Sequence, residues 1–378
     1  MKIYIHIPFC KQLCSYCDFY FSVSQLRTDE MCNCLMREME IKAARGDISW
    51  FENDLPDTLY FGGGTPTVYS VSEIEKLAKK AMRLFFNKFP DEWTVEANPD
   101  DITEKYLAQL AETGVNRLSI GIQSFIDRDL QIMRRRHSAI DGIKAVENAK
   151  KAGFKNISID LIYGFQGMSL FDWEYNLDRA ISLDIQHISA YHLSIESKTL
   201  LGKMAAKGKF APVDENLSAM QYEMLENKLL ESGYIHYEIS NFAMPDFFSR
   251  HNSAYWTKKP YIGIGPSAHS YNGKNLRMSN IANNIEYIDS IGKGIIPENT
   301  EILSEIDLYN ESVMTGLRTV EGVDISQISD RFRKFFEEKA GKYLLSGALA
   351  AENGKYKIPS KYFLISDSII TDFIMVDN

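Results

Sequence analysis

Short runs in which apolar and polar residues alternate recur through the first half of the chain, and each is followed by a longer run with a helical period. The short runs are bounded by Gly, Pro or Asn and predict strands at residues 2–7, 58–61, 93–97, 117–122, 156–161 and 187–193. The longer runs predict helices at residues 29–45, 71–87, 103–112, 139–152, 170–183 and 216–232. Six strand–helix units in succession predict a parallel sheet.

One face of these predicted strands is polar. In the fourth strand, three apolar residues alternate with Ser119, Gly121 and Gln123, and the fifth strand sets Ser158 and Asp160 against isoleucine and leucine. A doubly wound sheet covered by helices on both faces would bury such groups without partners, whereas a curled sheet can gather them in a lumen that holds a ligand. We therefore predict an α/β fold built on a partial (β/α)6 TIM-like barrel rather than a Rossmann sheet.

Chemically capable residues follow the ends of the predicted strands. A glycine-rich run, residues 62–67, comes after the second strand, and Glu96, Gln123, Asp160 and Tyr191 lie at later strand ends. Any one of them could merely cap a turn, but together they indicate a site, because active sites of such barrels lie at the carboxyl ends of the strands.

The alternation fades after about residue 200, which predicts three parts. Residues 1–215 form the barrel, residues 216–300 extend it and carry the run from His251 to Trp256, and residues 301–378 form a small winged-helix-like α+β domain. In the last part the sequence predicts a hairpin at Asn353-Gly354, preceded by helices at residues 305–315, 325–333 and 335–346. Winged modules often bind DNA, but the run 325–333 is not strongly basic.

Composition limits the classes of protein that fit. The chain has 378 residues, 45% of them hydrophobic, and a formal net charge of −9. This acidic balance argues against a nucleic-acid partner, although Arg134, Arg135 and Arg136 make a local basic run. No apolar run reaches the length of a transmembrane segment, and the first residues already read as a strand, without a signal peptide. We expect a soluble cytoplasmic protein.

The cysteines supply the most specific signal. Cys10, Cys14 and Cys17 are spaced C-x3-C-x2-C directly after the first strand, and three thiolates at this spacing can hold three irons of a cubane cluster while the fourth iron stays open. Structural zinc usually takes four protein ligands, and five cysteines in 378 residues are too few and odd in number for a disulfide framework. Cys32 and Cys34 lie on different faces of a predicted helix.

Four stretches, residues 4–19, 62–67, 121–125 and 160–164, together resemble the radical S-adenosylmethionine (SAM) enzymes, more closely the group of oxygen-independent coproporphyrinogen III oxidases and heme chaperones. The resemblance implies a [4Fe-4S] cluster on the three cysteines, SAM on its open iron, and a radical formed by cleavage of SAM. By position it implies a SAM site made of Tyr4, Tyr16, Gly63, Gly64, Thr65, Glu96, Gln123, Arg135 and Asp160. Tyr191 is either near the adenine or an inward aromatic that fills the barrel.

Departures from the group's patterns favour the chaperone branch. Phe19 stands where the oxidases have a fourth cysteine, and the extension that the oxidases have before their first strand is missing. The run from His251 to Trp256 is similar to the HNxxYW signature that the branch uses for heme, so His251 is either a heme ligand or a hydrogen-bonded histidine packed beside Trp256. The run 165–169 differs from the group's usual turn after Asp160.

The resemblance therefore implies a radical-SAM-type heme chaperone that delivers heme to acceptor proteins of the respiratory chain, meeting the membrane only through such partners. The alternative is an oxygen-independent coproporphyrinogen III oxidase of porphyrin biosynthesis, so whether the chain is an enzyme stays open. A third class, a radical enzyme that modifies RNA, has only the winged module and Arg134–Arg136 in its favour.

Overall fold

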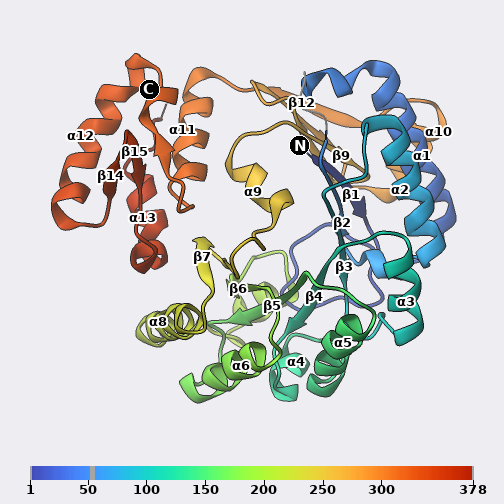
Figure 1. Cartoon of the computed structure of the whole chain (residues 1–378), viewed down its shortest axis with the longest axis horizontal. Helices are drawn as coiled ribbons and strands as arrows, with labels where there is room; N and C mark the ends of the chain where they lie inside the picture. Colours follow the sequence, from blue (N-terminus) through green and yellow to red (C-terminus); the bar gives the residue numbers. More distant parts are fainter. Residues whose placement is uncertain (1, 52–55, 377–378) are drawn as a thin grey trace.

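The computed structural model describes residues 2–51 and 56–376, and its centre is a curved parallel sheet (Figure 1). The expected domain limits at residues 1 and 378 lie outside this range. Six parallel strands follow one another in chain order, as expected. They are β1 (Lys2–Ile7), β2 (Thr58–Gly63), β3 (Glu92–Ala97), β4 (Arg117–Gln123), β5 (Ile157–Tyr163) and β6 (His187–His192).

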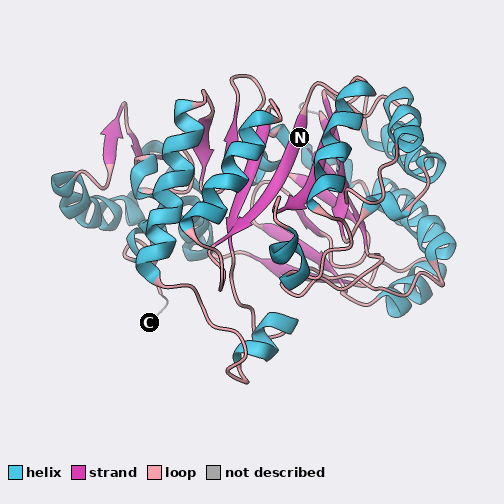
Figure 2. Ribbon diagram, turned by 90° about the horizontal axis from the view of Figure 1, so that it is seen from below, coloured by secondary structure: helices cyan, strands magenta, loops and turns pink. Residues whose placement is uncertain are grey.

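Helices cover the outer face of this sheet and leave its inner face to the lumen (Figures 1 and 2). Leu118, Ile120 and Ile122 of β4 are fully buried, as their place on the apolar face predicts. The expected helices are present as α1 (Thr28–Arg45), α2 (Val71–Phe85), α3 (Glu104–Glu112), α5 (Ala139–Lys151), α6 (Leu170–Ser182) and α8 (Glu215–Glu231). Two short helices, α4 (Asp127–Ile132) and α7 (Leu200–Ala205), were not expected.

Capping boxes explain why several helices begin where they do. The side chains of Ser70, Ser138 and Ser169 each accept a hydrogen bond from the backbone three residues on, and the acidic residue there bonds back to the serine. These motifs satisfy backbone N–H groups that have no partner within the helix.

The sheet continues beyond the six expected strands on both sides. Next to β6 lie β8 (Asn241–Ala243) and then β7 (Ile235–Glu238), both antiparallel to their neighbour. On the other side β9 (Tyr261–Ile264) runs parallel to β1, followed by three antiparallel strands. Within the described residues the outermost strands do not pair with each other, so the barrel stays open. The three further strands are β10 (His269–Tyr271), β11 (Leu276–Asn280) and β12 (Glu298–Ile302).

Two helices belong to this extension. Helix α9 (Arg250–Trp256) carries the expected His251 motif and contacts β2, and α10 (Asn284–Gly292) packs against α1. Across residues 2–51 and 56–376, no helix combines the length and the apolar character that crossing a membrane requires.

The C-terminal part has the element order of a winged-helix module and stands to one side of the barrel (Figure 1). The expected hairpin is confirmed: Asn353 and Gly354 have φ of 53° and 78°, the left-handed values of a tight two-residue turn. The three strands pair in the order β13-β15-β14. The elements are α11 (Glu305–Gly316), β13 (Val323–Asp324), α12 (Asp330–Ser346), β14 (Ala350–Glu352), β15 (Lys355–Lys357) and α13 (Ser366–Thr371).

The expectation of separate helices at residues 325–333 and 335–346 is wrong. Ile325–Gln327 form a single 3-10 turn, capped by the side chain of Asp324, and α12 then runs unbroken from Asp330 through residue 334 to Ser346. Ser329 is the residue that precedes the helix, and no Gly or Pro interrupts it before Gly341. The gap placed at residue 334 therefore had no physical basis.

Candidate functional site

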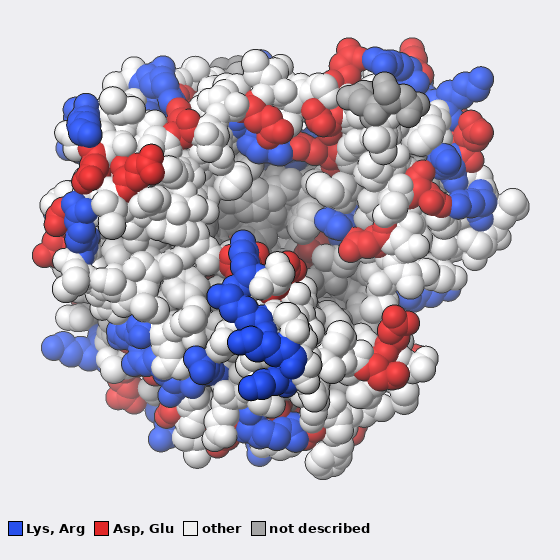
Figure 3. Space-filling model, turned by 180° about the vertical axis from the view of Figure 1, so that it is seen from behind, with Lys and Arg blue, Asp and Glu red and all other residues white. Residues whose placement is uncertain are grey.

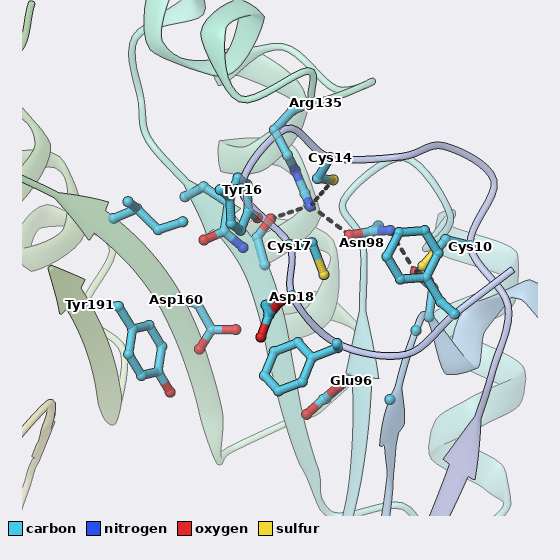
Figure 4. A pocket seen from close by; sticks show the side chains of 18 of the residues that line it. Cys10, Cys14, Tyr16, Cys17, Asp18, Glu96, Asn98, Arg135, Asp160 and Tyr191 are labelled. Atoms are coloured by element: carbon cyan, nitrogen blue, oxygen red, sulfur yellow. Dashed lines mark hydrogen bonds between the residues drawn. The ribbon is translucent and has the colours of Figure 1, made fainter. Parts of the chain in front are cut away.

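A cavity of about 440 Å³ opens at the carboxyl ends of the barrel strands (Figure 4). The structure brings nearly all the expected site residues to its wall, and only Tyr4 and His251 are not among them. The expected residues on the wall are Cys10, Cys14, Tyr16, Cys17, Gly63, Gly64, Thr65, Glu96, Gln123, Arg135, Asp160 and Tyr191. The volume lies in the range of small-molecule cofactor sites.

Backbone hydrogen bonds close the cysteine loop on itself and tie its middle to the segment after α4. Cys10 donates its backbone N–H to Ser22 O at 3.0 Å, and Ser15 donates to Met133 O at 3.1 Å. Thr65 Oγ1 lies 3.4 Å from Cys10 Sγ. Burial raises the pKa of Cys10 to about 12 and that of Cys17 to about 11, so these thiols need nearby positive charge to act as thiolates.

The run from Gly62 to Gly64 packs directly against the backbone of the cysteine loop, which leaves no room for larger side chains at Gly64. Gly64 donates its backbone N–H to Ile7 O at 2.8 Å, and Thr65 donates to Phe9 O at 2.7 Å. A Cβ atom on Gly64 would lie 2.5 Å from Phe9 O, and Gly63 has a φ of +110° that other residues rarely adopt. The run thus brings backbone groups of β2 to the same wall as the thiols.

Two half-buried carboxyls face the cavity from neighbouring strands. Burial raises the pKa of Glu96 to about 7, although a hydrogen bond of 2.7 Å from Tyr60 Oη to its Oε1 acts in the opposite direction. Burial also raises the pKa of Asp160 to about 6, against the effects of a hydrogen bond from Ser189 and the charge of Arg117. Both carboxyls can therefore bind a cationic or hydroxyl group of a ligand more strongly than a solvated acid can.

The half-buried guanidinium of Arg135 completes the cavity wall. Arg135 donates from Nη2 to Asn98 Oδ1 at 2.6 Å and to Gly121 O at 2.7 Å, while its Nη1 lies 3.5 Å from Cys14 Sγ. A side chain on Gly121 would crowd this guanidinium at 3.3 Å, so the missing Cβ makes room for it. Gln123 reaches the cavity from a φ of 68°, next to an irregularity in the β4–β5 pairing.

Two of the three arginines in the basic run around Arg135 contact groups of the same chain. Arg135 points into the cavity, and Arg136 pairs with Asp100 at 2.9 Å. Seen from behind, a short group of Lys and Arg side chains lies below a central hollow, with acidic side chains beside its mouth (Figure 3). Of the three arginines, only Arg135 lines the cavity, so the local basic run is partly accounted for by this site.

His251 lies at the opposite end of the lumen. It is 1% exposed, its Nδ1 is 2.9 Å from Thr58 Oγ1, and its Nε2 is 3.1 Å from Tyr255 Oη. Its backbone N–H donates to Glu92, and its ring lies 4.7 Å from that of Tyr60. Because Thr58 and Glu92 open their strands, α9 closes the amino end of the barrel, away from the cysteines. Its role as a heme ligand stays a prediction.

Three residues that hold the wall together were not expected. Asn98, which also donates to Thr65 Oγ1 at 3.0 Å, links the glycine run to Arg135, and its place one residue beyond β3 could have indicated this. Tyr60 and Ser189 support Glu96 and Asp160 from inward positions of β2 and β6. Strand alternation places both of them on the polar face.

Comparisons with known proteins agree with this geometry. A model of the radical SAM superfamily matches residues 4–180, and a model of the HemN C-terminal domain matches residues 303–359. Over 345 residues the chain is 38% identical to the heme chaperone HemW of Bacillus subtilis, covering 90% of this chain and 87% of that protein. It is 31% identical to the heme chaperone HemW of Lactococcus lactis over 380 residues, covering 99% and 97%.

A solved structure matches almost the whole fold. The radical SAM enzyme coproporphyrinogen III oxidase (HemN) from Escherichia coli superimposes with a TM-score of 0.82, covering 99% of this chain and 90% of that one. At 22% identity this match shows a shared fold, an α/β radical SAM domain followed by a HemN-like C-terminal domain. The longer and closer sequence matches show the family. The chain belongs to the radical SAM superfamily and, within it, to the family of heme chaperones named HemW.

Proposed function

We propose that this protein is a heme chaperone that holds a [4Fe-4S] cluster, binds SAM beside it, and binds heme for delivery to acceptor proteins, including those of the respiratory chain. The observation that carries the proposal is one cavity that joins three thiols, a glycine run and two carboxyls in a chain 38% identical to a protein of that name. The superfamily as a whole implies the cluster and SAM.

The donor set fits such a cluster. Cys10, Cys14 and Cys17 line one cavity, yet within residues 2–51 and 56–376 no three Cys, His, Asp or Glu side chains converge on a point that a single ion could occupy. This arrangement suits three thiolates that each hold a different iron better than it suits one zinc ion. When bound, the cluster supplies the electron that cleaves SAM.

The chain's own residues would orient SAM in the remaining space. Glu96 and the backbone of Gly63 would bind its ammonium group, and Arg135, which contacts Cys14 and Asn98, would hold that side of the site in position. Asp160 and Gln123 face the part of the cavity where Tyr191 offers an aromatic surface for adenine. Tyr4 lies beneath this wall, hydrogen-bonded to His6 at 3.2 Å, and supports it without lining the cavity.

A second candidate function is oxygen-independent coproporphyrinogen III oxidation, because the fold matches that oxidase over 99% of the chain. Phe19 argues against it: this 75% exposed side chain stands where the oxidase pattern has a fourth cysteine. The fold alone does not distinguish the two functions.

Anaerobic cluster reconstitution followed by parallel incubation with heme and with coproporphyrinogen III separates them. A chaperone is expected to develop a Soret band with heme, to transfer heme to an acceptor apoprotein, and to leave the porphyrinogen unchanged. Consumption of coproporphyrinogen III with release of 5'-deoxyadenosine would favour the oxidase. A flat heme titration of protein with a full complement of iron and sulfide would refute the chaperone.

A further inference from the structure

Arg117 is a fully buried cation in the barrel lumen that has no part in the site described above. It is the first residue of β4 and is 1% exposed. Strand alternation puts it on the inner face with Ser119, Gly121 and Gln123, three residues that line the cavity. Arg117 is not on the cavity wall itself, so it lies deeper in the lumen, on the amino side of the cavity.

The guanidinium of Arg117 lacks the partners that a purely structural role would require. Within the described part of the chain its Nε and Nη1 are buried without a hydrogen-bond acceptor, and its side chain forms no ion pair. By contrast Lys42, another fully buried cation, pairs with Glu38 at 2.9 Å and donates to Gly263 O at 2.7 Å. A buried charge without such partners is costly, so this one calls for a functional explanation.

Ser119, the next inward residue of β4, lies between Arg117 and both carboxyls of the site. It is opposite Glu96 in the β3–β4 pairing, and it donates a hydrogen bond to Asp160. Figure 4 shows the two carboxyls in the cavity. Because two residues along a strand span only about 7 Å, Arg117 begins one inward position below them, a distance over which charges interact strongly in a protein interior.

The charge of Arg117 acts on groups from several elements around the lumen, and of these only Glu96 and Asp160 ionise near neutral pH. Burial raises the pKa of Glu96 to about 7 and that of Asp160 to about 6, and the charge of Arg117 opposes both shifts. Burial keeps the other groups neutral, because it raises the pKa of a tyrosine and lowers that of a histidine. These groups are Tyr60, His187, Tyr237 and His251.

The proposed cofactor makes this control of charge useful. SAM carries a positive sulfonium and a positive ammonium group beside its carboxylate, so it binds best to carboxyls that are ionised. With a pKa of about 7, Glu96 is only half ionised at neutral pH, and without the charge of Arg117 it would be mostly protonated. A direct salt bridge from Arg117 would instead occupy the carboxylate oxygens that the cofactor needs.

We propose that Arg117 is a positioning residue of the SAM site, which acts from inside the lumen to keep Glu96 and Asp160 charged toward the cationic cofactor. The inference rests on the proposed function, since it concerns the SAM site of the same chaperone. It explains why this guanidinium is held close to two carboxyls without pairing with either.

The test measures the affinity of cluster-reconstituted wild type, Arg117→Met and Arg117→Lys for SAM and for its uncharged fragment 5'-methylthioadenosine. If Arg117→Met raises the pKa of Glu96 to about 8, the ionised fraction at neutral pH falls about fivefold. We therefore expect SAM to bind at least about fivefold more weakly, and the uncharged fragment to change by less than about twofold. Arg117→Lys keeps the charge and should retain most of the affinity for SAM.

Thr94→Val is the matched control. Thr94 lies opposite Arg117 in the β3–β4 pairing, and its buried hydroxyl also has no hydrogen-bond partner among the described residues. The substitution alters the lumen beside Arg117 without removing a charge, so the affinity for SAM should not change. Iron content and the unfolding midpoint report whether each variant is folded, and Arg117→Gln takes the place of Arg117→Met if the methionine variant does not fold.

The pH dependence of SAM binding supplies a readout that a merely structural role would not move. The difference between wild type and Arg117→Met should shrink to within about twofold at about pH 8.5, where Glu96 is mostly ionised in both proteins. The other titratable groups around the two carboxyls are the same in both proteins. Those facing Glu96 are Tyr4, Cys17, Tyr60, Tyr191 and Tyr255, and Tyr16 and Arg135 also face Asp160.

The outcomes separate this inference from the function on which it rests. Folded Arg117→Met that binds SAM as tightly as the wild type at neutral pH would overturn the role of Arg117 and leave the chaperone standing. Equal weakening for SAM and for 5'-methylthioadenosine, without recovery at the higher pH, would also overturn it, because the side chain would then only shape the lumen. If the wild type, with its cluster intact, binds no SAM, both the proposed function and the role of Arg117 are wrong.

Discussion

Both ends of the barrel lumen contain buried polar side chains, but those at the carboxyl end line a cavity and those at the amino end bond to one another. At the carboxyl end, thiols, carboxyls and a guanidinium face a cavity, and burial raises the pKa values of Cys10, Glu96 and Asp160. At the amino end, His251 is sealed by bonds to Thr58 and Tyr255. From this contrast we expect the carboxyl end to serve binding and the amino end to serve stability, the division that barrels generally show.

The largest effect should come from the open end. Cys14→Ser removes one of three proposed cluster ligands, so we expect iron and sulfide content after anaerobic reconstitution to fall nearly to background. The unfolding free energy of the metal-free protein should change by less than about 1 kcal/mol, because Cys14 is only half-buried. Cys34→Ser, in α1, is the matched control and should keep its iron. Full iron content in Cys14→Ser would refute the cluster assignment.

At the amino end, around His251, we expect the reverse: a large loss of stability and little change in cluster content. His251→Ala leaves a cavity and takes a hydrogen-bond partner from both Thr58 and Tyr255, so we expect a loss of about 3–4 kcal/mol in unfolding free energy. Urea unfolding of the metal-free protein measures it, with the exposed His192→Ala as control. Cluster content should stay normal in whatever fraction is folded. A change in unfolding free energy below about 1 kcal/mol would contradict the interpretation that α9 stabilises the barrel by closing its amino end.

The close packing of Gly64 against the cysteine loop predicts an effect of intermediate size on both stability and iron uptake. Gly64→Ala forces a Cβ atom to within 2.5 Å of Phe9 O, so the glycine run and the cysteine loop must separate. We expect about 1–3 kcal/mol lower stability together with reduced iron uptake. Gly292→Ala, where a Cβ would meet no atom within 4 Å, is the control. Equal effects of the two substitutions would show that the contact with Phe9 is unimportant.

The sequence predicted the residues at the carboxyl end of the barrel more accurately than the arrangement at the amino end around His251. Strand alternation and strand ends predicted that Glu96, Gln123 and Asp160 would share one rim, because parallel strands place their carboxyl ends together. The C-x3-C-x2-C run follows the first strand directly, so its three thiols were expected at the same rim. The sequence did not predict that α9 would close the other end, since that position depends on contacts between residues almost 200 apart in the chain.

The strands between residues 235 and 302 were missed for a related physical reason. Strands β7 to β12 are only three to five residues long, too short for the alternation of apolar and polar residues to stand out in the sequence. Their placement depends on buried groups such as the Glu38–Lys42 pair, whose partners come from distant elements. The role of Asn98 was missed because an amide beyond a strand end has many local uses.

The smallest expected effect concerns the titration of Glu96. Its pKa in the folded protein, about 7, is raised from the ordinary 4.5, so the folded state holds this proton more tightly than the unfolded state. The stability that this provides is fully present below about pH 4.5 and is lost as the pH rises through about 7. Relative to Glu96→Gln, metal-free wild type should therefore lose about 1–2 kcal/mol between about pH 5 and pH 8, less than full burial would give because the carboxyl faces a cavity.

Asp160, Arg117 and Tyr60 also face Glu96, and because they are present in both proteins their contributions largely cancel in this difference. The same holds for the buried histidines, whose lowered pKa values favour the folded state at higher pH. Urea unfolding of both proteins at the two pH values measures the difference. If the difference in unfolding free energy between the two proteins does not change with pH, Glu96 is ionised at both pH values. The carboxyl end would then stabilise its charged groups as completely as the amino end satisfies the hydrogen bonds of His251.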